Sequence, residues 1–193
     1  MVSRFIRGIA VLGFSLALTC FVPLDVMALN VDIFSGHSTS GGGAPFSNLA
    51  GSFTSPDISF ATSTGYDWHP FGLGNFGADI TGILSIPSNG NYIFSLNSDD
   101  GSLLFIDGVL VIDNGGTHGP TVVASPSTVL TAGNHPFEVQ FFEDLGGPSG
   151  VDLSLPSGVT YAAASGAVPE PGTITLLGLG LVGLGFRYRR MSN

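Results

Sequence analysis

The middle of this 193-residue chain is predicted to be all-β, with the antiparallel strands of a β-sandwich. Three observations support the prediction. Apolar and polar residues alternate with a period of two, which is the spacing of a strand with one buried face. Turn residues rich in Gly and Asn separate these short runs. No window of useful length between residues 29 and 161 shows helical periodicity.

The alternation is clearest over residues 92–97, 137–142 and 151–155. The predicted buried faces of these runs consist of Tyr92, Phe94, Leu96, Phe137, Val139, Phe141, Val151, Leu153 and Leu155. Asp107-Gly108 separates two further apolar runs and is typical of a two-residue hairpin turn with positive φ. The stretch over residues 38–44 is rich in Ser and Gly and predicts a mobile loop. Short strands at this spacing indicate a sandwich or a barrel.

The region over residues 29–168 has the size of one domain and is strongly acidic. About 140 residues can bury one adequate hydrophobic core. The region contains ten Asp, two Glu and no Lys or Arg, which is a formal charge of −12. Because such a surface repels phosphate backbones, nucleic-acid binding is excluded. Disorder is disfavoured, since many Phe, Ile, Val and Leu residues are interleaved with the acidic ones.

The N-terminus has the order of a secretory signal peptide, which we assign to residues 1–28 as a signal helix. Arg4 and Arg7 precede an apolar run over residues 9–22, and Val26-Met27-Ala28 offers a cleavage site. The run is short for a membrane span, so an uncleaved anchor is the lesser alternative. Cys20 is the only cysteine, and it raises the further alternative of a lipoprotein signal. Cleavage at residue 28 removes Cys20 and leaves a mature protein without disulfides.

The C-terminus has three parts in a fixed order. Pro169-Glu170-Pro171 is followed by an uncharged segment over residues 172–186 and then by a cluster of arginines over residues 187–190. As a helix the uncharged segment spans about 22 Å, which is short of a hydrocarbon core, and flanking Tyr and Arg side chains extend the match. We therefore predict a C-terminal membrane-spanning helix with its basic end in the cytoplasm. Residues 162–168 form a linker of small residues before it.

This tail, over residues 169–193, resembles a PEP-CTERM sorting signal with Pro169, Glu170 and Pro171 as its motif. The resemblance implies a bacterial protein whose partner is an exosortase-type transpeptidase. It also implies an exported, membrane-anchored intermediate, then cleavage near the motif and delivery to the cell surface or the extracellular matrix. An ordinary C-terminal membrane anchor, without cleavage, is the alternative.

Three motifs occur in order in the middle of the chain: residues 90–96 (GNYIFSL), residues 98–102 (SDDGS) and residues 106–108 (IDG). In this order they resemble the protective-antigen domain family. The resemblance covers residues 29–161. It implies a modular β-sandwich of the kind found in toxins, glycosidases and adhesins, often binding glycans, with calcium in its lectin members.

The resemblance implies that Asp99 and Asp100 are metal ligands and carbohydrate-binding residues. Consecutive side chains on a regular strand point to opposite faces, so two adjacent carboxylates hold one ion only where the backbone breaks this alternation. In the calcium-dependent lectins of the family a cis peptide bond does so. The alternative is that residues 99–102 only form a turn after the preceding strand.

The second calcium loop of the family corresponds here to residues 143–150. Asp144 is the side-chain ligand that we expect from this loop, and loop carbonyl groups add further oxygens, because calcium takes about six to eight oxygen ligands. The loop lacks the Asn and Trp of some yeast adhesin members, which leaves the ligand set and the sugar preference open.

Other candidate sites are weaker. Tyr66, Trp68 and Phe71 form either a sugar-stacking platform or the packed end of the sandwich. His118 and His135 lie near predicted turns, where satisfied structural histidines are commoner than metal ligands, and no histidines pair at short metal spacings. Glu138 and Glu143 are the only glutamates of the domain, and they do not have the arrangement of a glycosidase pair. We therefore expect no enzymatic activity.

Taken together, the sequence predicts an exported cell-surface or extracellular-matrix protein. Its leading function is calcium-dependent binding of exopolysaccharide or surface glycans, which is a form of adhesion. The alternative is a structural or interaction protein of the exopolysaccharide matrix that has no sugar site. The sugar and the oligomeric state are left open.

Overall fold

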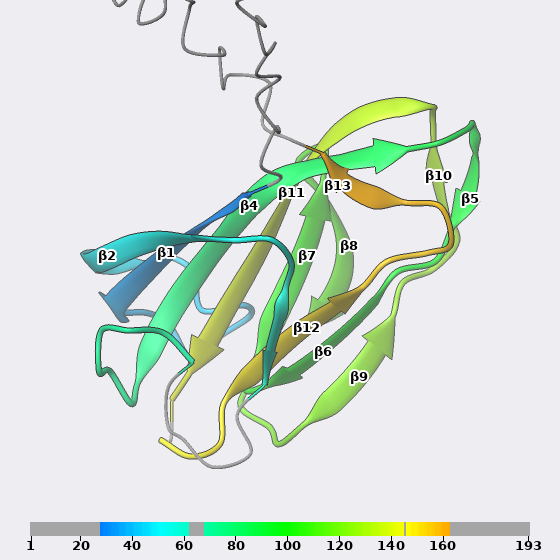
Figure 1. Ribbon diagram of the computed structural model, residues 1–193. Coiled ribbons are helices and arrows are strands. Elements are labelled where there is room, and N and C mark those ends of the chain that lie inside the picture. Colours follow the sequence, from blue (N-terminus) through cyan, green and yellow to red (C-terminus); the bar gives the residue numbers. More distant parts are fainter. Residues whose placement is uncertain (1–27, 62–67, 145, 163–193) are drawn as a thin grey trace, which may run out of the picture.

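The computed structural model describes residues 28–61, 68–144 and 146–162. Within these ranges the chain forms only β-strands, joined by turns and loops (Figure 1). The strands are β1 Leu29–Gly36, β2 Ser47–Ser55, β3 Ser59–Ala61, β4 Phe76–Ile86, β5 Gly90–Tyr92, β6 Ser95–Asp99, β7 Ser102–Ile106, β8 Val109–Asn114, β9 Thr121–Ala124, β10 Thr128–Leu130, β11 Gly133–Glu143, β12 Gly150–Ser154 and β13 Thr160–Ala162. The predicted all-β fold is confirmed.

Two sheets pack face to face, and every strand pair is antiparallel. The larger sheet has the order β2-β1-β4-β11-β7-β8, and β13 pairs with the C-terminal part of β4. The smaller sheet has the order β3-β12-β6-β9. Strands β5 and β10 form a separate two-stranded ribbon at one end of the sandwich. The predicted signal helix and C-terminal membrane-spanning helix lie outside the described residues. Among the residues described, no helix is long and apolar enough to span a bilayer.

The hydrophobic core lies between the two sheets, because each strand turns one of its alternating faces inward. Ile80 and Leu84 of β4 and Val139 of β11 are fully buried from one side, and Leu96 of β6 is fully buried from the other. The residues predicted from period-two alternation all belong to this core except Leu155, which is partly buried against it. Alternation therefore predicted the inward faces correctly.

The predicted run over residues 92–97 is divided in the structure. Strand β5 ends at Tyr92 and pairs with β10, whereas β6 begins at Ser95 and pairs with β12 and β9. At the break, the Phe94 amide donates to the Ser125 hydroxyl at 2.9 Å, and the Phe94 carbonyl accepts from the Ser125 amide at 2.9 Å. The run changes its hydrogen-bonding partners here, so it changes sheets while its side chains keep their alternation.

The loop over residues 38–44 folds over the outer face of the larger sheet. The Ser38 amide donates to the Gly43 carbonyl at 2.7 Å, and the Gly116 amide donates to the Gly41 carbonyl at 3.2 Å. Phe142, which alternation assigns to the outer face, is fully buried under this loop. The His37 ring stacks on it with ring centroids 5.4 Å apart.

The hairpin predicted at Asp107-Gly108 is confirmed. These two residues join β7 to β8 with φ values of 53° and 74°. Positive φ at both central residues is the geometry that a two-residue turn needs to match the twist of its strands. His135 of β11 fixes this turn, because its Nδ1 lies 2.7 Å from an Asp107 carboxylate oxygen and its Nε2 lies 3.0 Å from the Thr131 carbonyl. Hydrogen bonding to Asp107 raises the pKa of His135.

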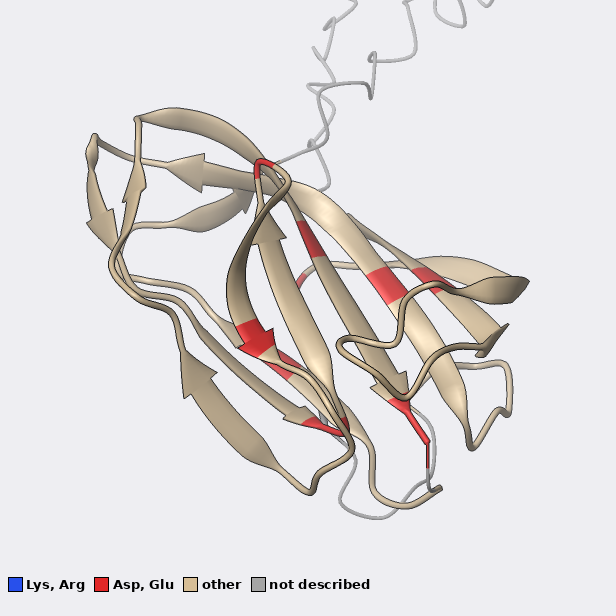
Figure 2. Ribbon diagram, turned by 180° about the vertical axis from the view of Figure 1, so that it is seen from behind, with Lys and Arg blue, Asp and Glu red and all other residues tan. Residues whose placement is uncertain are grey.

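The outer face of the larger sheet carries neighbouring carboxylates, and no Lys or Arg lies among the described residues (Figure 2). Asp79 of β4 is directly opposite Asp32 of β1, and Glu138 of β11 is paired two positions farther along, with Thr81. One Asp79 oxygen is buried without a hydrogen-bond partner in the described structure. Burial, followed by the charges of Glu138 and Asp32, raises the pKa of Asp79 to about 6.

Replacing Asp79 by Asn is expected to stabilise the protein at neutral pH. An aspartate with a raised pKa in the folded state favours folding when it is protonated, so the free energy of unfolding falls as pH rises from about 4 to about 7. Asp79→Asn removes this pH dependence and adds on the order of 1–2 kcal/mol at neutral pH, after allowance for the exposed part of the carboxyl. Urea unfolding of both proteins across this pH range measures the effect. Asp113→Asn, at an exposed position of β8, is the control, and equal pH slopes for wild type and Asp79→Asn contradict the prediction.

Candidate functional site

The turn between β6 and β7 contains the predicted metal ligands. Strand β6 ends at Asp99, β7 begins at Ser102, and the peptide bond between Asp99 and Asp100 is cis. This is the geometry that the family resemblance implies. Gly101 completes the turn at a point of close packing, because a Cβ atom there would lie 2.8 Å from the Gly116 carbonyl oxygen and 2.9 Å from that of Gly41. A larger residue at this position would displace both loops.

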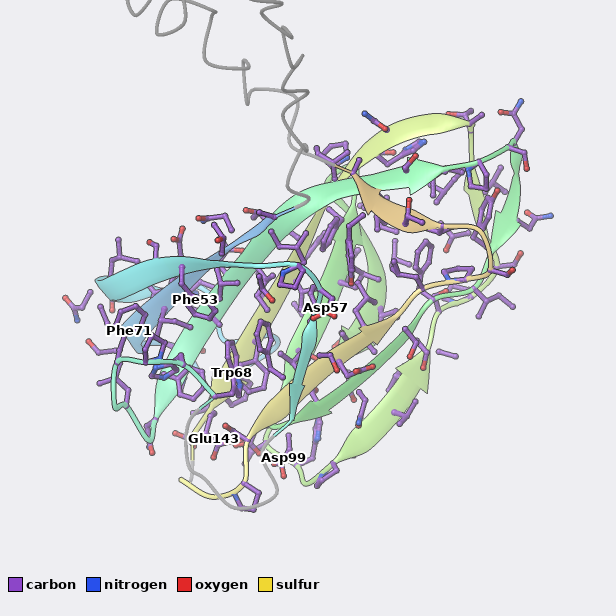
Figure 3. The ribbon with its side chains drawn as sticks, in the orientation of Figure 1. Phe53, Asp57, Trp68, Phe71, Asp99 and Glu143 are labelled. Atoms are coloured by element: carbon purple, nitrogen blue, oxygen red, sulfur yellow. The ribbon has the colours of Figure 1, made fainter. Side chains whose placement is uncertain are left out.

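Three carboxylates meet at this end of the sandwich. Asp99, Asp100 and Glu143 each have an oxygen within 4.8 Å of an oxygen of the other two. Glu143 is the last residue of β11, and Figure 3 shows it beside Asp99 at the end where β6 and β11 approach each other. Asp100 and Glu143 are buried, whereas Asp99 is partly exposed. The group therefore combines acids from two different sheets, with one side open to solvent.

Backbone amide groups hold Asp100 in place. Its Oδ1 accepts from the His118 amide at 2.8 Å, and its Oδ2 accepts from the Asp144 amide at 3.1 Å. Asp144 thus contributes its main chain to the site, while its carboxylate is not part of the three-acid group. Sequence reasoning named Asp144, and not Glu143, as the side-chain ligand expected from this loop. The missed signal is strand parity, because Glu143 follows the inward-facing Phe141 by two residues.

His118 orders the loop before β9 on the other side of the site. Its Nδ1 lies 2.9 Å from the Gly119 carbonyl and its Nε2 lies 3.0 Å from the Asn114 carbonyl. With both ring nitrogens engaged by carbonyl groups, the side chain has a structural role. This agrees with the interpretation of His118 as a satisfied structural histidine.

A buried polar network lies directly behind the turn. The Ser98 and Ser102 hydroxyls are 2.7 Å apart, and the Asn114 amide nitrogen donates to Ser98 at 2.9 Å and to the Thr121 carbonyl at 3.0 Å. Ser98, Ser102 and Asn114 are all buried. The network connects the strands on both sides of the turn with β8 and β9. It holds the residues that flank Asp99 and Asp100 in one arrangement.

Burial and like charge oppose ionisation at the site. Burial, and then the charge of Asp100, raise the pKa of Asp99, and His118 acts in the opposite direction. Carboxylates this close repel one another, and a bound cation removes that repulsion. A hollow of about 270 Å³ opens over the group, which we call the acidic hollow. Its walls come from Asp99, Asp100, Glu143 and the loops over residues 117–119 and 146–148.

The aromatic residues near Trp68 form part of the packed end of the sandwich. The Trp68 ring stacks on Phe60 with centroids 4.3 Å apart and meets Phe76 and Phe141 edge-on or tilted at 5.3 and 5.7 Å. Figure 3 shows Trp68 between the sheets, next to Phe53. The packing interpretation thus holds for Trp68, since one face of its ring stacks on Phe60 and further aromatic rings pack around it. Tyr66 lies outside the described residues.

Comparison with models of known protein families assigns the chain to a family. A model of the PA14 domain matches residues 31–165, which is more than half of the chain. The chain belongs to the PA14 domain family. A model of the PEP-CTERM protein-sorting motif matches residues 167–190, which include Pro169, Glu170 and Pro171. These three residues lie outside the described ranges. The two matches together identify an exported surface protein, and the sorting motif supports export with membrane-anchored sorting.

Solved structures with the same fold include several binding domains. The chain matches a PA14 sugar-binding domain from an RTX adhesin with 18% identity and a TM-score of 0.55, over 72% of this chain and 95% of that one. It matches the A domain of epithelial adhesin 9 from Candida glabrata, in complex with Galb1-4GlcNAc, with 13% identity and a TM-score of 0.51, over 77% and 96% of the two chains. At such identities the likeness concerns the fold alone.

A third similar structure is an anti-sigma factor domain-containing protein, with 20% identity and a TM-score of 0.60 over 76% of this chain. The chain spans half the length of that protein. Glycosidases also occur among the similar structures, and the match covers 16% of one such enzyme. A search of curated proteins finds no match. Adhesin domains, an anti-sigma factor domain-containing protein and a glycosidase thus all contain a domain similar to this one.

Loss of the buried network is expected to destabilise the fold. Asn114→Ala removes two hydrogen bonds and leaves the Thr121 carbonyl without this donor. We expect a loss of about 1–3 kcal/mol in the free energy of unfolding, measured by urea denaturation. Asn91→Ala, at an exposed position of β5, is the matched control. Equal stability of the two variants would show that the network does not hold the turn.

Proposed function

We propose that this PA14 domain binds carbohydrate through a calcium ion held by Asp99, Asp100 and Glu143. The observation that carries the proposal is the convergence of these three carboxylates within 4.8 Å beneath a hollow open to solvent. Sugar-binding adhesin domains of the same fold support it.

The donor atoms of the site suit calcium. Calcium takes about six to eight oxygen ligands, from carboxylates, carbonyl groups and water. The site offers carboxylate oxygens, and the loop over residues 146–148, which lines the same hollow, is a source of main-chain carbonyl ligands. Cys20 is the only cysteine of the chain, and the His118 ring nitrogens are engaged by carbonyl groups, so the soft ligands that zinc favours do not assemble here.

A bound calcium ion supplies open coordination positions that two neighbouring sugar hydroxyls take in place of water. The residues around it determine which sugars fit. The Asp100 carboxylate is fixed by two amide donors, so its orientation is set before any ligand arrives. The loops over residues 117–119 and 146–148 line the acidic hollow and limit the approach of the sugar ring.

The proposal excludes catalysis by the glutamate pair. A glycosidase needs two carboxyl groups roughly 5–10 Å apart across a cleft. Glu138 and Glu143 are five residues apart on one strand, a separation of about 16 Å. Glu138 lies in the middle of the larger sheet, while Glu143 belongs to the acidic hollow. The positions of the two glutamates agree with a binding domain that is delivered to the cell surface or the extracellular matrix. Its partners would be exopolysaccharide or surface glycans, and its processing enzyme would be an exosortase-type transpeptidase.

Calcium is expected to raise the melting temperature of the protein, and Asp100→Ala is expected to abolish the rise. At one hundred times its dissociation constant, calcium adds about 2.7 kcal/mol to the free energy of unfolding. Differential scanning calorimetry with calcium, with magnesium and with a chelator measures the effect. Asp113→Ala is the control, and its melting temperature still rises with calcium. An unchanged melting temperature of the wild type at millimolar calcium would sink the proposal.

The ligand set has its own test, because sequence and structure favour different acids in the loop over residues 143–150. Glu143→Gln is expected to weaken calcium binding at least about tenfold, since it removes one charge from the three-acid group. Asp144→Asn keeps the amide that donates to Asp100 and is expected to leave the affinity within about twofold. Isothermal titration calorimetry with calcium compares the two variants. The opposite ranking assigns the ligand to Asp144.

Retention on immobilised exopolysaccharide separates the proposal from a structural matrix protein without a sugar site. A sugar-binding domain is retained with calcium and released by a chelator. A structural protein without a sugar site shows no calcium-dependent retention. Turnover of glycosidase substrates would instead revive an enzymatic function.

A further inference from the structure

A second hollow, of about 190 Å³, adjoins the acidic hollow on the outer face of the smaller sheet. Asn97 of β6 and Asp152 of β12 are directly opposite each other in the sheet and form part of its lining. Their neighbours along the strands, Ser98 and Val151, are buried, so both side chains project outward. Pro120 and Pro148 flank them, from the loops before β9 and before β12. We call this site the sheet hollow.

The two hollows share part of their lining. Asp99 and Pro148 line both of them. A molecule held above Asp99 and extending along the outer face of β6 therefore enters the sheet hollow. Directly opposed side chains in an antiparallel pair have Cβ atoms about 4.5–5.5 Å apart, so Asn97 and Asp152 both reach a single ring placed between the two prolines.

The chemistry of the sheet hollow matches a sugar ring. The Asp152 carboxylate accepts hydrogen bonds from hydroxyl groups, and its one hydrogen-bond donor in the described structure, the Ser154 hydroxyl, is 3.4 Å away. The Asn97 side chain offers its amide nitrogen as a donor, while its Oδ1 is buried without a hydrogen-bond partner in the described structure. The rings of Pro120 and Pro148 give apolar walls for the C–H faces of a sugar. Polar groups on the floor and apolar walls are typical of small-molecule sites.

The charges of this region exclude an acidic ligand. Asp99 and Asp152 line the sheet hollow together with polar and apolar residues, and no Lys or Arg occurs among the described residues. In the proposed complex, calcium offsets two of the three negative charges of the acidic hollow and leaves Asp152 negative as well. A uronate carboxylate here would lie beside a like charge with no cationic partner.

We propose that the sheet hollow binds the second sugar of a glycan whose first sugar sits on the calcium ion, and that this second sugar is an uncharged hexose. The inference rests on the proposed function and extends it, because it assigns a ligand class and a chain length. It follows that the protein binds oligosaccharides more tightly than single sugars. It also follows that a glycan with a uronate as its second sugar binds more weakly than one with a neutral hexose there.

Isothermal titration calorimetry with calcium tests the inference. The probes are glucose, galactose and mannose oligomers one to four sugars long, together with their uronic acid counterparts. For the hexose that binds, we expect the disaccharide to bind at least tenfold more tightly than the monosaccharide. Asp152→Ala reduces this ratio to below threefold, while its affinities for calcium and for the monosaccharide stay within twofold of the wild type.

Asp57→Ala is the matched control. Burial raises the pKa of Tyr161, and the charges of Asp57 and Asp152 add to this effect; Asp57 is thus an exposed acid in the same region, and it does not line the hollow. We expect this control to keep the wild-type ratio of disaccharide to monosaccharide affinity. Equal affinities of the wild type for monosaccharide and disaccharide overturn the inference. An unchanged ratio of disaccharide to monosaccharide affinity in Asp152→Ala also overturns it, and so does a uronate disaccharide that binds as tightly as the neutral one. These outcomes leave calcium-dependent monosaccharide binding in place, whereas absence of any calcium-dependent sugar binding removes the proposed function and the sheet hollow with it.

Discussion

The pairing of β7 with β11 is the constraint on which the candidate site depends. It sets Ser102 opposite Phe141, and the Phe142 amide donates to the Gly101 carbonyl at 3.0 Å. These contacts hold the β6–β7 turn against the end of β11, so the acids of the turn meet Glu143. Because register in an antiparallel pair is set by the buried pattern, a shift by one residue would turn Glu143 away from the turn. The core residues of β11 therefore position the site as much as its polar residues do.

The site concentrates negative charge in a partly buried place, which costs stability unless something offsets it. Two amide groups donate to Asp100, and the network of Ser98, Ser102 and Asn114 satisfies the buried polar groups behind it. These hydrogen bonds offset the cost of removing the polar groups from water, but they do not neutralise the negative charges of the carboxylates. The remaining repulsion among the carboxylates is the physical reason for the calcium ion that we propose, since the described residues include no Lys or Arg to offset the charge.

The sequence was sufficient to predict the fold class and the inward faces of the strands, because both follow from period-two alternation. It was also sufficient for the hairpin at Asp107, where the turn chemistry is local. It did not predict the division of the run at Phe94, because that depends on Ser125, which lies 31 residues away. Asp99 and Asp100 could be identified from a motif. Glu143 depends on a contact between sheets, and Phe142 is covered by a loop whose packing no local pattern reveals.

The position of β13 has a consequence for how the domain presents its ligand surface. Along β4, Phe76 is paired with Glu143 of the acidic hollow, whereas Ile83 is paired with Ala162, the last residue of β13. These points are seven residues apart, a distance of about 23 Å. The chain thus leaves the sandwich well away from the hollow. If the segment beyond Ala162 tethers the protein to a surface, the two hollows lie at the distal end of the domain, where polymers in the surrounding medium can reach them.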